Sequence, residues 1–453
     1  MLFYFLLIRI VALFGHRKAK KLIAGQCEVR RYLKEHKDTG DALQGCIWFH
    51  ASSVGEFEQA RPIIEALVNG IDQTNLSRRK PLLPNAEGRS GFHASSVGEF
   101  EQARPIIEKM KMEKPGTKIL LTFFSPSGYE LRKDYKYADK VMYLPFATRR
   151  NARHFLHVFK PSMAIFIKYE FWPAYLRELN HRDIPTFLIS GIFRPKQTFF
   201  KPWGSSYRHL LTRFTRLYVQ DTASLELLAK FGIKNVEVAG DTRFDRVHAI
   251  AQHAKDIPSV EHFINAQLNE FERPTDKVIV AGSTWPQDEQ LLARYIEEHP
   301  DVKLVLVPHE IDEHHLHNIF QIFQGRYVRF TEATPNNVLH VQTFVIDTIG
   351  MLSSIYRYGH VAYIGGGFGV GIHNTLEPAV YGMPVVFGPN YQRFREAKGL
   401  IAAGAGFSVN NYEEFERTMD MALEQYEALG KKAKEYVASE LGATGKISRE
   451  IFN

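Results

Sequence analysis

Short apolar runs alternate with stretches of helical periodicity along most of this chain. The runs KILLTFF, KVMYLPF, MAIFIKY, TFLIS, RLYVQ and VEVAG have the length of buried strands, and helical patterns such as that of residues 222–231 separate them. After a polar stretch at residues 251–275 a second series follows, namely VIVAG, KLVLVP, TFVID, VAYIGGG and PVVFG. Repeated strand–helix units predict parallel, doubly wound α/β sheets, here two in tandem with a cleft between them.

The length of the chain also favours two domains, because 453 residues exceed what one hydrophobic core usually organises. An apolar content of 45% predicts a globular protein rather than a disordered one. We expect an N-terminal domain at residues 23–247, a linker at 248–275 and a C-terminal domain at 276–453. The pattern leaves open whether the last helices close the second domain or cross back to the first.

Residues 1–22 differ from the rest of the chain. The run MLFYFLLIRIVALFG is apolar apart from one arginine, and it ends at a basic cluster of Arg17, Lys18, Lys20 and Lys21. It is shorter than the roughly 20 residues that span a bilayer. Phe and Leu followed by cations favour a helix that lies on an anionic leaflet with its cations on the cytoplasmic side. A buried first helix and a truncated span are the alternatives.

The charge of the chain limits the kinds of binding partner, and its cysteine content limits the kinds of covalent and metal cross-link. Lys and Arg number 57 against 50 Asp and Glu, and the resulting net charge of +7 favours an anionic partner without choosing among phosphate, nucleic acid and lipid. The two cysteines, Cys27 and Cys46, exclude a disulfide framework and a four-cysteine zinc site.

An identical segment occurs twice. FHASSVGEFEQARPIIE occupies residues 49–65 and again 92–108, and no other part of the chain repeats. The first copy follows CIWF, a good buried strand, whereas the second follows GRSG, which does not have the pattern of a strand. We therefore expect the first copy to sit in the sheet and an insert at about residues 66–108 to loop out.

The repeated segment carries the first candidate for chemistry. The segment HASSVGEFEQARP follows the strand CIWF directly and presents Glu56 at the carboxyl end of the sheet, where open α/β sheets place reactive groups. A carboxylate there can act as a general base. Glu99, the equivalent residue of the second copy, is the alternative candidate for this general base. The alternative is a solvated glutamate in the first turn of a helix that only complements the helix dipole.

The second candidate is a glycine-rich loop at residues 361–388, VAYIGGGFGVGIHNTLEPAVYGMPVVFG. A buried strand leads into Gly366 and Gly367, and Asn374 and Glu377 follow at the start of a helix. Free backbone amides can approach a phosphate closely, and a carboxylate beyond them can accept hydrogen bonds from ribose hydroxyls. A glycine run alone is a weak signal for a nucleotide. The HNTLEP segment and the complete helix–strand unit that follow strengthen it.

Several motifs resemble those of the family of Kdo (3-deoxy-D-manno-octulosonic acid) transferases. The glycine loop with HNTLEP resembles that family's nucleotide-sugar signature, and HASSVGEFEQARPIIE resembles the segment that holds its catalytic glutamate. LLTFFSPSGYE, KYEFWP, ISGIFRP, VAGDTRFDRV, VAGSTWPQDE and LVPHEID also match, so the resemblance covers nearly the whole chain after about residue 40. It implies a glycosyltransferase-B fold, in which two Rossmann-like doubly wound domains face a cleft.

The resemblance also implies a function. It is inverting transfer of Kdo from CMP-Kdo to a lipid A precursor, with no metal or other cofactor and no nucleic-acid partner, at the cytoplasmic side of the cell inner membrane. Another nucleotide-sugar transferase or an epimerase on the same fold, or a catalytically inactive relative, are the alternatives.

The family's functional residues carry over by motif. Glu56, or its duplicate Glu99, would deprotonate the acceptor hydroxyl. The donor-binding residues would be Arg243, Gly282, Ser283, Thr284, Pro308, His309, Gly366, Gly367, Asn374 and Glu377. Within this set, Arg243 would hold the sugar carboxylate or phosphate and Glu377 the ribose. LVPHEID departs from the family pattern, because it lacks a basic residue between Pro308 and His309.

Overall fold

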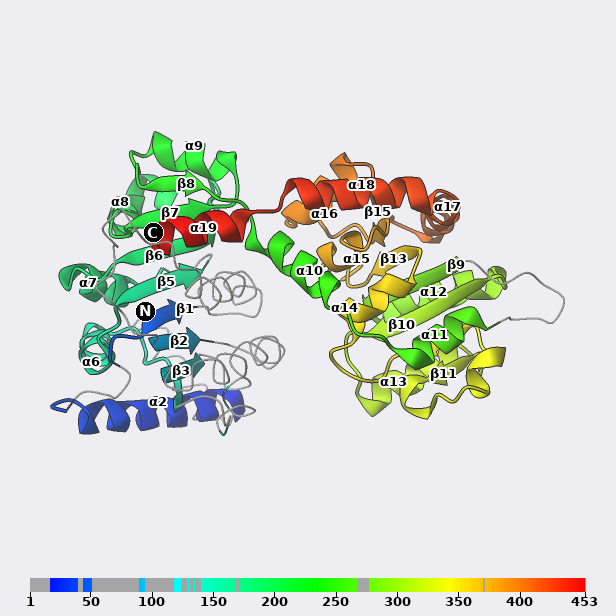
Figure 1. Cartoon of the computed structure of the whole chain (residues 1–453), viewed down its shortest axis with the longest axis horizontal. Coiled ribbons are helices and arrows are strands. Elements are labelled where there is room, and N and C mark those ends of the chain that lie inside the picture. The colour runs from blue at the N-terminus through cyan, green and yellow to red at the C-terminus, as the bar shows by residue number, and fades with distance from the viewer. Residues whose placement is uncertain are drawn as a thin grey trace, which may run out of the picture. The chain divides into compact units, whose positions relative to one another are not determined.

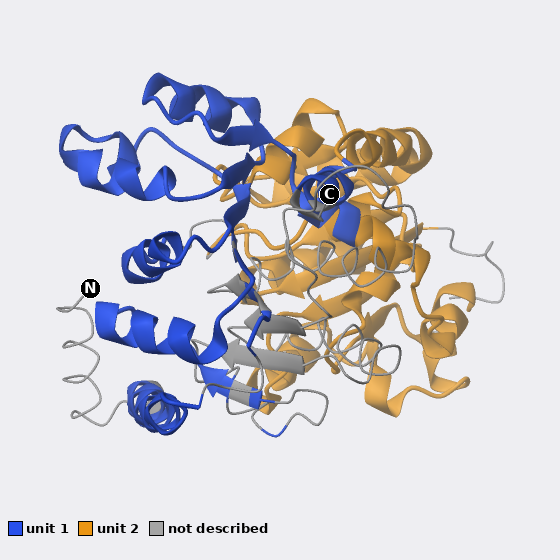
Figure 2. Ribbon diagram, turned by 60° about the vertical axis from the view of Figure 1, so that its left-hand side comes forward, with its two compact units in different colours: residues 1–246, 441–453 blue, residues 247–440 orange. Residues whose placement is uncertain are grey.

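The computed structural model describes residues 17–39, 44–50, 89–93, 118–123, 129, 134, 140–167, 171–266, 277–369 and 371–452. It divides into two compact units (Figure 2): unit 1 comprises Met1–Arg246 with Leu441–Asn453, and unit 2 comprises Val247–Glu440. Each unit contains one parallel sheet with helices, so the predicted α/β class with two doubly wound sheets is confirmed.

The sheet of unit 1 has the strand order β4-β3-β2-β1-β5-β6-β7-β8 (Figure 1). Its strands are β1 (Ile47–His50), β2 (Arg89–His93), β3 (Lys118–Phe123), β4 (Lys140–Tyr143), β5 (Met163–Ile167), β6 (Thr186–Gly191), β7 (Arg216–Val219) and β8 (Val236–Val238). The helices are α2 (Arg17–Glu35), α6 (Arg149–Phe159), α7 (Pro173–His181), α8 (Ser205–Leu211), α9 (Thr222–Lys230), α10 (Thr242–Gln252) and α19 (Ala443–Phe452), with short 3-10 turns η1 (Thr198–Phe200) and η2 (Pro202–Gly204).

An aromatic cluster holds helices against this sheet. The buried Trp48 of β1 packs against Phe155, Phe166 and Tyr175, with ring centroids 5.2–5.4 Å apart. At the other edge, Gln26 of α2 accepts a hydrogen bond from the Phe146 amide and donates one to the Leu144 carbonyl, both 2.7 Å long. These contacts tie α2 and α6 to the ends of β1 and β4.

The sheet of unit 2 has the order β11-β12-β10-β9-β13-β14-β15. Its strands are β9 (Lys277–Thr284), β10 (Val302–Pro308), β11 (Tyr327–Arg329), β12 (Thr343–Val345), β13 (Val361–Ile364), β14 (Val385–Phe387) and β15 (Gly406–Ser408). The helices are α11 (Pro258–Asn265), α12 (Pro286–Glu298), α13 (Glu313–Ile322), α14 (Leu352–Ile355), α15 (Leu376–Ala379), α16 (Arg395–Ala402), α17 (Tyr412–Glu424) and α18 (Tyr426–Ser439), with short 3-10 turns η3 (Phe330–Glu332), η4 (Asn337–His340) and η5 (Tyr356–Tyr358).

The repeated segment behaves differently from the prediction. Arg89–His93, expected to lie in a looped-out insert, forms β2 and pairs in parallel with both β1 and β3. Ile47 pairs with Ser90 and Trp48 with Gly91, an offset of 43 residues that equals the offset between the two copies. Both copies therefore leave the sheet from neighbouring strands at the same level. The sheet supplies ladder partners on both sides, which outweighs the poor strand propensity of Arg-Ser-Gly.

The C-terminal helix crosses back to the first unit. Asp245 accepts hydrogen bonds from the amides of Gly442 (2.6 Å) and Thr444 (2.7 Å), and Lys446 of α19 donates to the Val238 carbonyl at 2.5 Å. Tyr218 of β7 donates to Glu450 at 3.2 Å, so α19 lies beside β7 (Figure 1). Residues 441–453 thus belong to unit 1 and not to the expected domain 276–453.

The boundary between the units also differs from the expected linker. It falls between Arg246 and Val247, inside α10, and α11 of the expected linker 248–275 folds as part of unit 2. Lys303 of β10 holds the end of α11 by donating to the carbonyls of Phe263 and Ile264. Among the described helices, none combines the length and the apolarity that crossing a bilayer requires.

Candidate functional site

The carboxyl ends of three neighbouring strands in unit 2 meet at one place. β9 lies between β10 and β13, and backbone bonds continue beyond the strands. The His309 amide donates to the Thr284 carbonyl and the Gly365 amide to the Gly282 carbonyl, each at 3.0 Å. The structure therefore brings together the predicted residues Gly282, Ser283, Thr284, Pro308, His309, Gly366 and Gly367.

Glycine is required where the loop after β13 approaches its neighbours. A Cβ atom on Gly365 would lie 2.3 Å from the Ser283 carbonyl oxygen, and one on Gly367 would lie 2.5 Å from the Gly388 nitrogen. Gly366 has a φ of +86°, in the left-handed region that favours glycine. The loop is thus packed backbone against backbone, and only glycine fits these positions.

Asp288, in the first turn of α12, fixes this glycine loop. Its buried carboxylate accepts hydrogen bonds from the Gly366 amide (2.8 Å), the Tyr363 hydroxyl (2.6 Å) and the Trp285 amide (2.9 Å). Burial raises the pKa of Asp288, and the three donated hydrogen bonds oppose that rise. A single side chain therefore connects the ends of β9 and β13.

Glu289, the next residue, connects β9 to α13. Its buried carboxyl accepts from the Thr284 hydroxyl and faces Nε2 of His315, both at 3.0 Å, while Nδ1 of His315 donates to the Glu310 carbonyl at 2.9 Å. Burial raises the pKa of Glu289, and its hydrogen bond with His315 is the main opposing effect. Glu289 therefore links Thr284, at the end of β9, to His315 of α13.

Three aromatic rings stack beside the glycine loop. Trp285 and His309 are 4.9 Å apart between centroids, His309 and His373 are 4.4 Å apart, and Trp285 Nε1 donates to His373 Nε2 at 3.3 Å. Burial lowers the pKa of His373 to about 4 and also lowers that of His309, so both rings are neutral at pH 7. A neutral planar stack of this kind is suited to contact a nucleobase.

Asn374 and Glu377 bond to each other. Asn374 Nδ2 donates to Glu377 Oε1 at 2.9 Å, and Asn374 Oδ1 accepts from the Leu376 amide at 3.1 Å. Asn374 directly follows the stacked ring of His373. Asn374 thus lies just before α15 and Glu377 in its first turn, next to the aromatic stack.

The other predicted residues lie elsewhere. Arg243 belongs to unit 1, where its guanidinium donates twice to the buried carboxylate of Asp241, at 2.7 and 2.9 Å. Glu56 and Glu99 lie outside the described residues. Within the described ranges, no group of three or more His, Cys, Asp or Glu side chains has the arrangement of a metal site.

Sequence reasoning missed five residues of this site: Trp285, Asp288, Glu289, His315 and His373. A local signal existed for Asp288, because Pro286 at the first helical position and an acid two residues later mark a helix start. No local signal points to the contacts of Asp288 with Gly366, of Glu289 with His315 or of His373 with Trp285, because these pairs are 26 to 88 residues apart.

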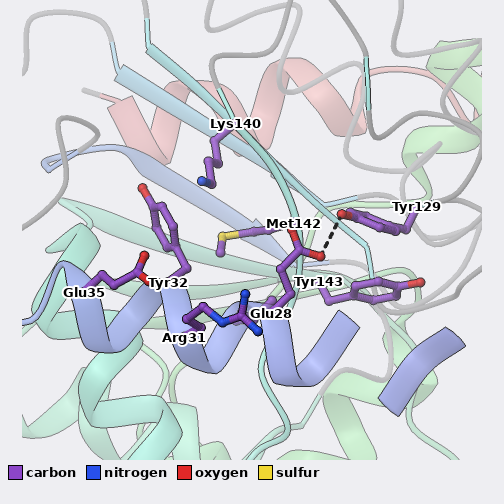
Figure 3. A pocket seen from close by; sticks show the side chains of 9 residues that line it. Glu28, Arg31, Tyr32, Glu35, Tyr129, Lys140, Met142 and Tyr143 are labelled. Carbon is purple, nitrogen blue, oxygen red and sulfur yellow. Dashed lines mark hydrogen bonds between the residues drawn. The ribbon is translucent and has the colours of Figure 1, made fainter. Parts of the chain in front are cut away.

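A small cavity of about 180 Å³ lies apart from these residues, between α2 and β4 of unit 1. Figure 3 shows Tyr32, Tyr129, Tyr143 and Lys140 around it, with Tyr129 donating to Glu28 at 3.2 Å. Lys140 Nζ lies 3.5 Å from the centre of the Tyr32 ring. None of the predicted site residues lines this cavity.

Comparisons with known proteins agree with the fold and the motifs. A family model described as 3-deoxy-D-manno-octulosonic-acid transferase (kdotransferase) matches residues 26–77 and 74–246, two stretches that each contain one copy of the repeat. A 3-deoxy-D-manno-octulosonic acid transferase of Aquifex aeolicus is 28% identical over 386 residues, which cover 83% of this chain and 86% of the relative. A bifunctional glycosyltransferase/methyltransferase of Fusobacterium nucleatum is 25% identical over 67% of this chain, and the chain spans 48% of that relative's length.

Solved structures support the fold alone at their low identities. The UDP-GlcNAc 2-epimerase of Neisseria meningitidis has a TM-score of 0.53 at 15% identity, covering 80% of this chain and 99% of its own. A further UDP-N-acetylglucosamine 2-epimerase has a TM-score of 0.54 at 12% identity, covering 90% and 94%.

The fold and the site together define an α/β protein of the glycosyltransferase-B type, with a glycine loop and an aromatic stack at the strand ends of its second sheet. The match to the Kdo transferase family model over residues 26–246, together with the similarity to a Kdo transferase over 83% of the chain, supports a Kdo glycosyltransferase.

Proposed function

We propose that this chain transfers Kdo from CMP-Kdo to lipid IVA, a lipid A precursor, in the biosynthesis of the lipopolysaccharide core. Transfer inverts the anomeric carbon and uses Glu56 as the general base. The observation that carries the donor half of this proposal is the glycine loop of unit 2, packed against β9 and flanked by the Trp285–His309–His373 stack. The similarity to Kdo transferases supplies the identity of the sugar.

The donor site divides into parts by chemistry. The backbone at Gly367, next to the Gly366 amide that Asp288 holds, and the start of α12 suit the phosphate of CMP. The stack of Trp285, His309 and His373 can contact the cytosine ring, and the Glu377 carboxylate can accept hydrogen bonds from the ribose hydroxyls. The carboxylate of Kdo requires a cation, and Arg243, held by Asp241, is the proposed one.

The acceptor half rests on the repeated segment. We place the base on Glu56 because its copy follows β1, whose Trp48 anchors the core of unit 1. The glutamate would take the proton of the acceptor hydroxyl while CMP leaves through an oxocarbenium-like transition state. Such a base contributes about 10²–10⁴-fold in rate.

The proposed location is the cytoplasmic side of the cell inner membrane, as a peripheral or monotopic protein. Residues 1–22, which are apolar and then basic, would anchor the chain on an anionic membrane surface. The acceptor is itself an anionic glycolipid, which agrees with the net charge of +7.

The test is transfer of labelled Kdo, from CMP-Kdo generated in situ, to lipid IVA. We expect transfer by the wild type, loss of at least about 100-fold in turnover for Glu56→Ala, and little change in CMP binding. Glu99→Ala reports on the second copy, and Glu226→Ala, an exposed acid on α9, is the matched control.

Loss of turnover only in Glu99→Ala would move the base to the second copy. Undiminished turnover in the double variant would contradict a base from either copy. A wild type that alters the sugar nucleotide without labelling the lipid would contradict the proposed reaction.

A further inference from the structure

The described part of unit 1 exposes an unusual group of aromatic side chains. Trp203 is 73% exposed, Tyr207 48% and Phe231 38%, and they lie on η2, on α8 and just after α9. Large apolar side chains normally gain free energy by burial, so a group of them on one surface indicates a partner.

A packed turn holds Trp203 in this exposed position. Gly204, the next residue, is buried, and a Cβ atom there would lie 2.1 Å from the Thr198 carbonyl oxygen. Arg208 donates to the carbonyls of Phe199 (2.8 Å) and Lys201 (3.3 Å), which closes the turn from the other side. The exposure of Trp203 is therefore built into the turn.

Ring contacts continue from this turn across the surface. Phe199 lies 6.3 Å from Tyr207 and 6.2 Å from Phe200, and Phe200 lies 5.1 Å from Phe231 between centroids. The guanidinium of Arg208 lies 5.2 Å from the Phe231 ring centre. Tyr207 and Phe231 are thus linked through the rings of Phe199 and Phe200, and a cation lies beside Phe231.

The charge of this region has one sign. Residues 184–220 contain no Asp or Glu. The Lys and Arg residues between positions 194 and 208 are Arg194, Lys196, Lys201 and Arg208. We name Arg194, Lys196, Lys201, Trp203, Tyr207, Arg208 and Phe231 the aromatic-basic surface.

Aromatic rings beside cations match the interface of an anionic bilayer. Trp and Tyr concentrate at the level of lipid headgroups, and each Lys or Arg near an anionic leaflet contributes about 1 kcal/mol. A nucleic acid would also attract cations, but the 73% exposed indole of Trp203 favours a surface with an apolar interior.

We propose that the aromatic-basic surface rests on an anionic lipid bilayer, with Trp203 inserted at the headgroup level. This deepens the proposed function, on which it rests for its biological setting, because the proposed acceptor is a lipid. It places a second membrane contact on unit 1, separate from residues 1–22.

The direct test is quenching of tryptophan fluorescence in the full chain by vesicles of brominated phosphatidylglycerol. We expect quenching in the wild type and its loss in Trp203→Phe, which keeps an aromatic ring but removes the reporter. This readout does not depend on residues 1–22, which contain no tryptophan. Quenching unchanged in Trp203→Phe would overturn the proposal.

Affinity for vesicles tests the charges. Lys196→Glu with Lys201→Glu should weaken binding to phosphatidylglycerol vesicles at least about 30-fold, because two cations worth about 1 kcal/mol each are lost and two repelled anions are added. The matched control is Lys398→Glu with Lys432→Glu, two exposed lysines of unit 2 with the same change in net charge. For the apolar part, Trp203→Ala should weaken binding, whereas Ile349→Ala, at a residue 85% exposed in unit 2, should not.

Equal weakening by both pairs of charge reversals would overturn the proposal, since it would show an effect of net charge alone. Binding of a protein partner that Trp203→Ala abolishes, with vesicle affinity unchanged, would also overturn it. A wild type whose Trp203 is quenched but which transfers no Kdo in detergent contradicts the proposed function and leaves this surface standing.

Discussion

The carboxyl edges of the two sheets hold their loops in different ways. In unit 2, Asp288 and Glu289 bond to groups that follow β9, lead out of β13 and begin α13, so each loop has its own partners. In unit 1, β1 and β2 end in register and continue into the same sequence, HASSVGEFEQARPIIE. Side-chain contacts thus distinguish the loops of unit 2. At β1 and β2, the strand ends alone do not distinguish one copy from the other.

A sequence motif therefore forms a defined site only when contacts from other parts of the fold fix its conformation. The glycine loop becomes a defined shape because Asp288 holds the Gly366 amide and because Gly365 packs on Ser283. The repeated segment, present twice, requires neighbours to decide which copy is used.

The largest effect is expected from a methyl group at the contact between the glycine loop and β9. Gly365→Ala should lower the stability of unit 2 by about 3 kcal/mol and weaken CMP binding at least about tenfold, because the Cβ atom would meet backbone atoms 2.3 Å away. Gly369→Ala, four residues on, meets no described atom within 4 Å and is the control. Chemical denaturation and calorimetric titration with CMP measure both, and equal values for the two variants would refute the packing argument.

The second largest loss of stability is expected at Asp288, whose carboxylate fixes the glycine loop. Asp288→Asn replaces one acceptor oxygen by an amide that faces N–H and O–H donors, so we expect a loss of about 2 kcal/mol and weaker CMP binding. Glu297→Gln, exposed on the same helix, should change stability by less than about 0.5 kcal/mol. If Asp288→Asn unfolds at the same denaturant concentration as the wild type, Asp288 does not hold the loop.

A smaller effect should appear in the pH dependence of stability. Burial lowers the pKa of His373 from 6.5 to about 4, so the unfolded chain binds more protons between these values and the folded state loses stability as the pH falls through them. His373→Phe removes this titration. The stability difference between wild type and variant should therefore shift in favour of the variant from pH 7 to pH 4 in thermal unfolding, and a constant difference would show that His373 does not titrate as its burial requires.

The smallest effect is expected from removing one repeat unit. Excision of residues 50–92 joins Phe49 to His93 and leaves a single intact copy after β1, so β1 can take the place of β2 beside β3. We expect a folded chain with unchanged CMP binding and with turnover retained. Loss of the fold in circular dichroism, or loss of turnover in a folded chain, would show that both copies are needed.

The sequence predicted much of the fold because its signals are local. The run KILLTFF became β3 and the run VAYI became β13, and the glycine loop lies where its residues indicated. The prediction that GRSG lies outside the sheet was wrong, because the strand conformation of Arg89–His93 depends on pairing with β1 and β3. His315 and His373 were missed because the groups that they contact are up to 88 residues away.

The alternation of apolar runs and helical patterns was enough to predict two parallel α/β sheets, and the order of the motifs was enough to reveal the resemblance to Kdo transferases. Only the tertiary structure decided that Arg89–His93 is a strand, that α19 joins unit 1, and which buried carboxylate holds which loop. The physical reason is that strand periodicity and turn residues act on neighbours in the chain. Ladder pairing and buried hydrogen bonds depend on groups that folding alone brings together.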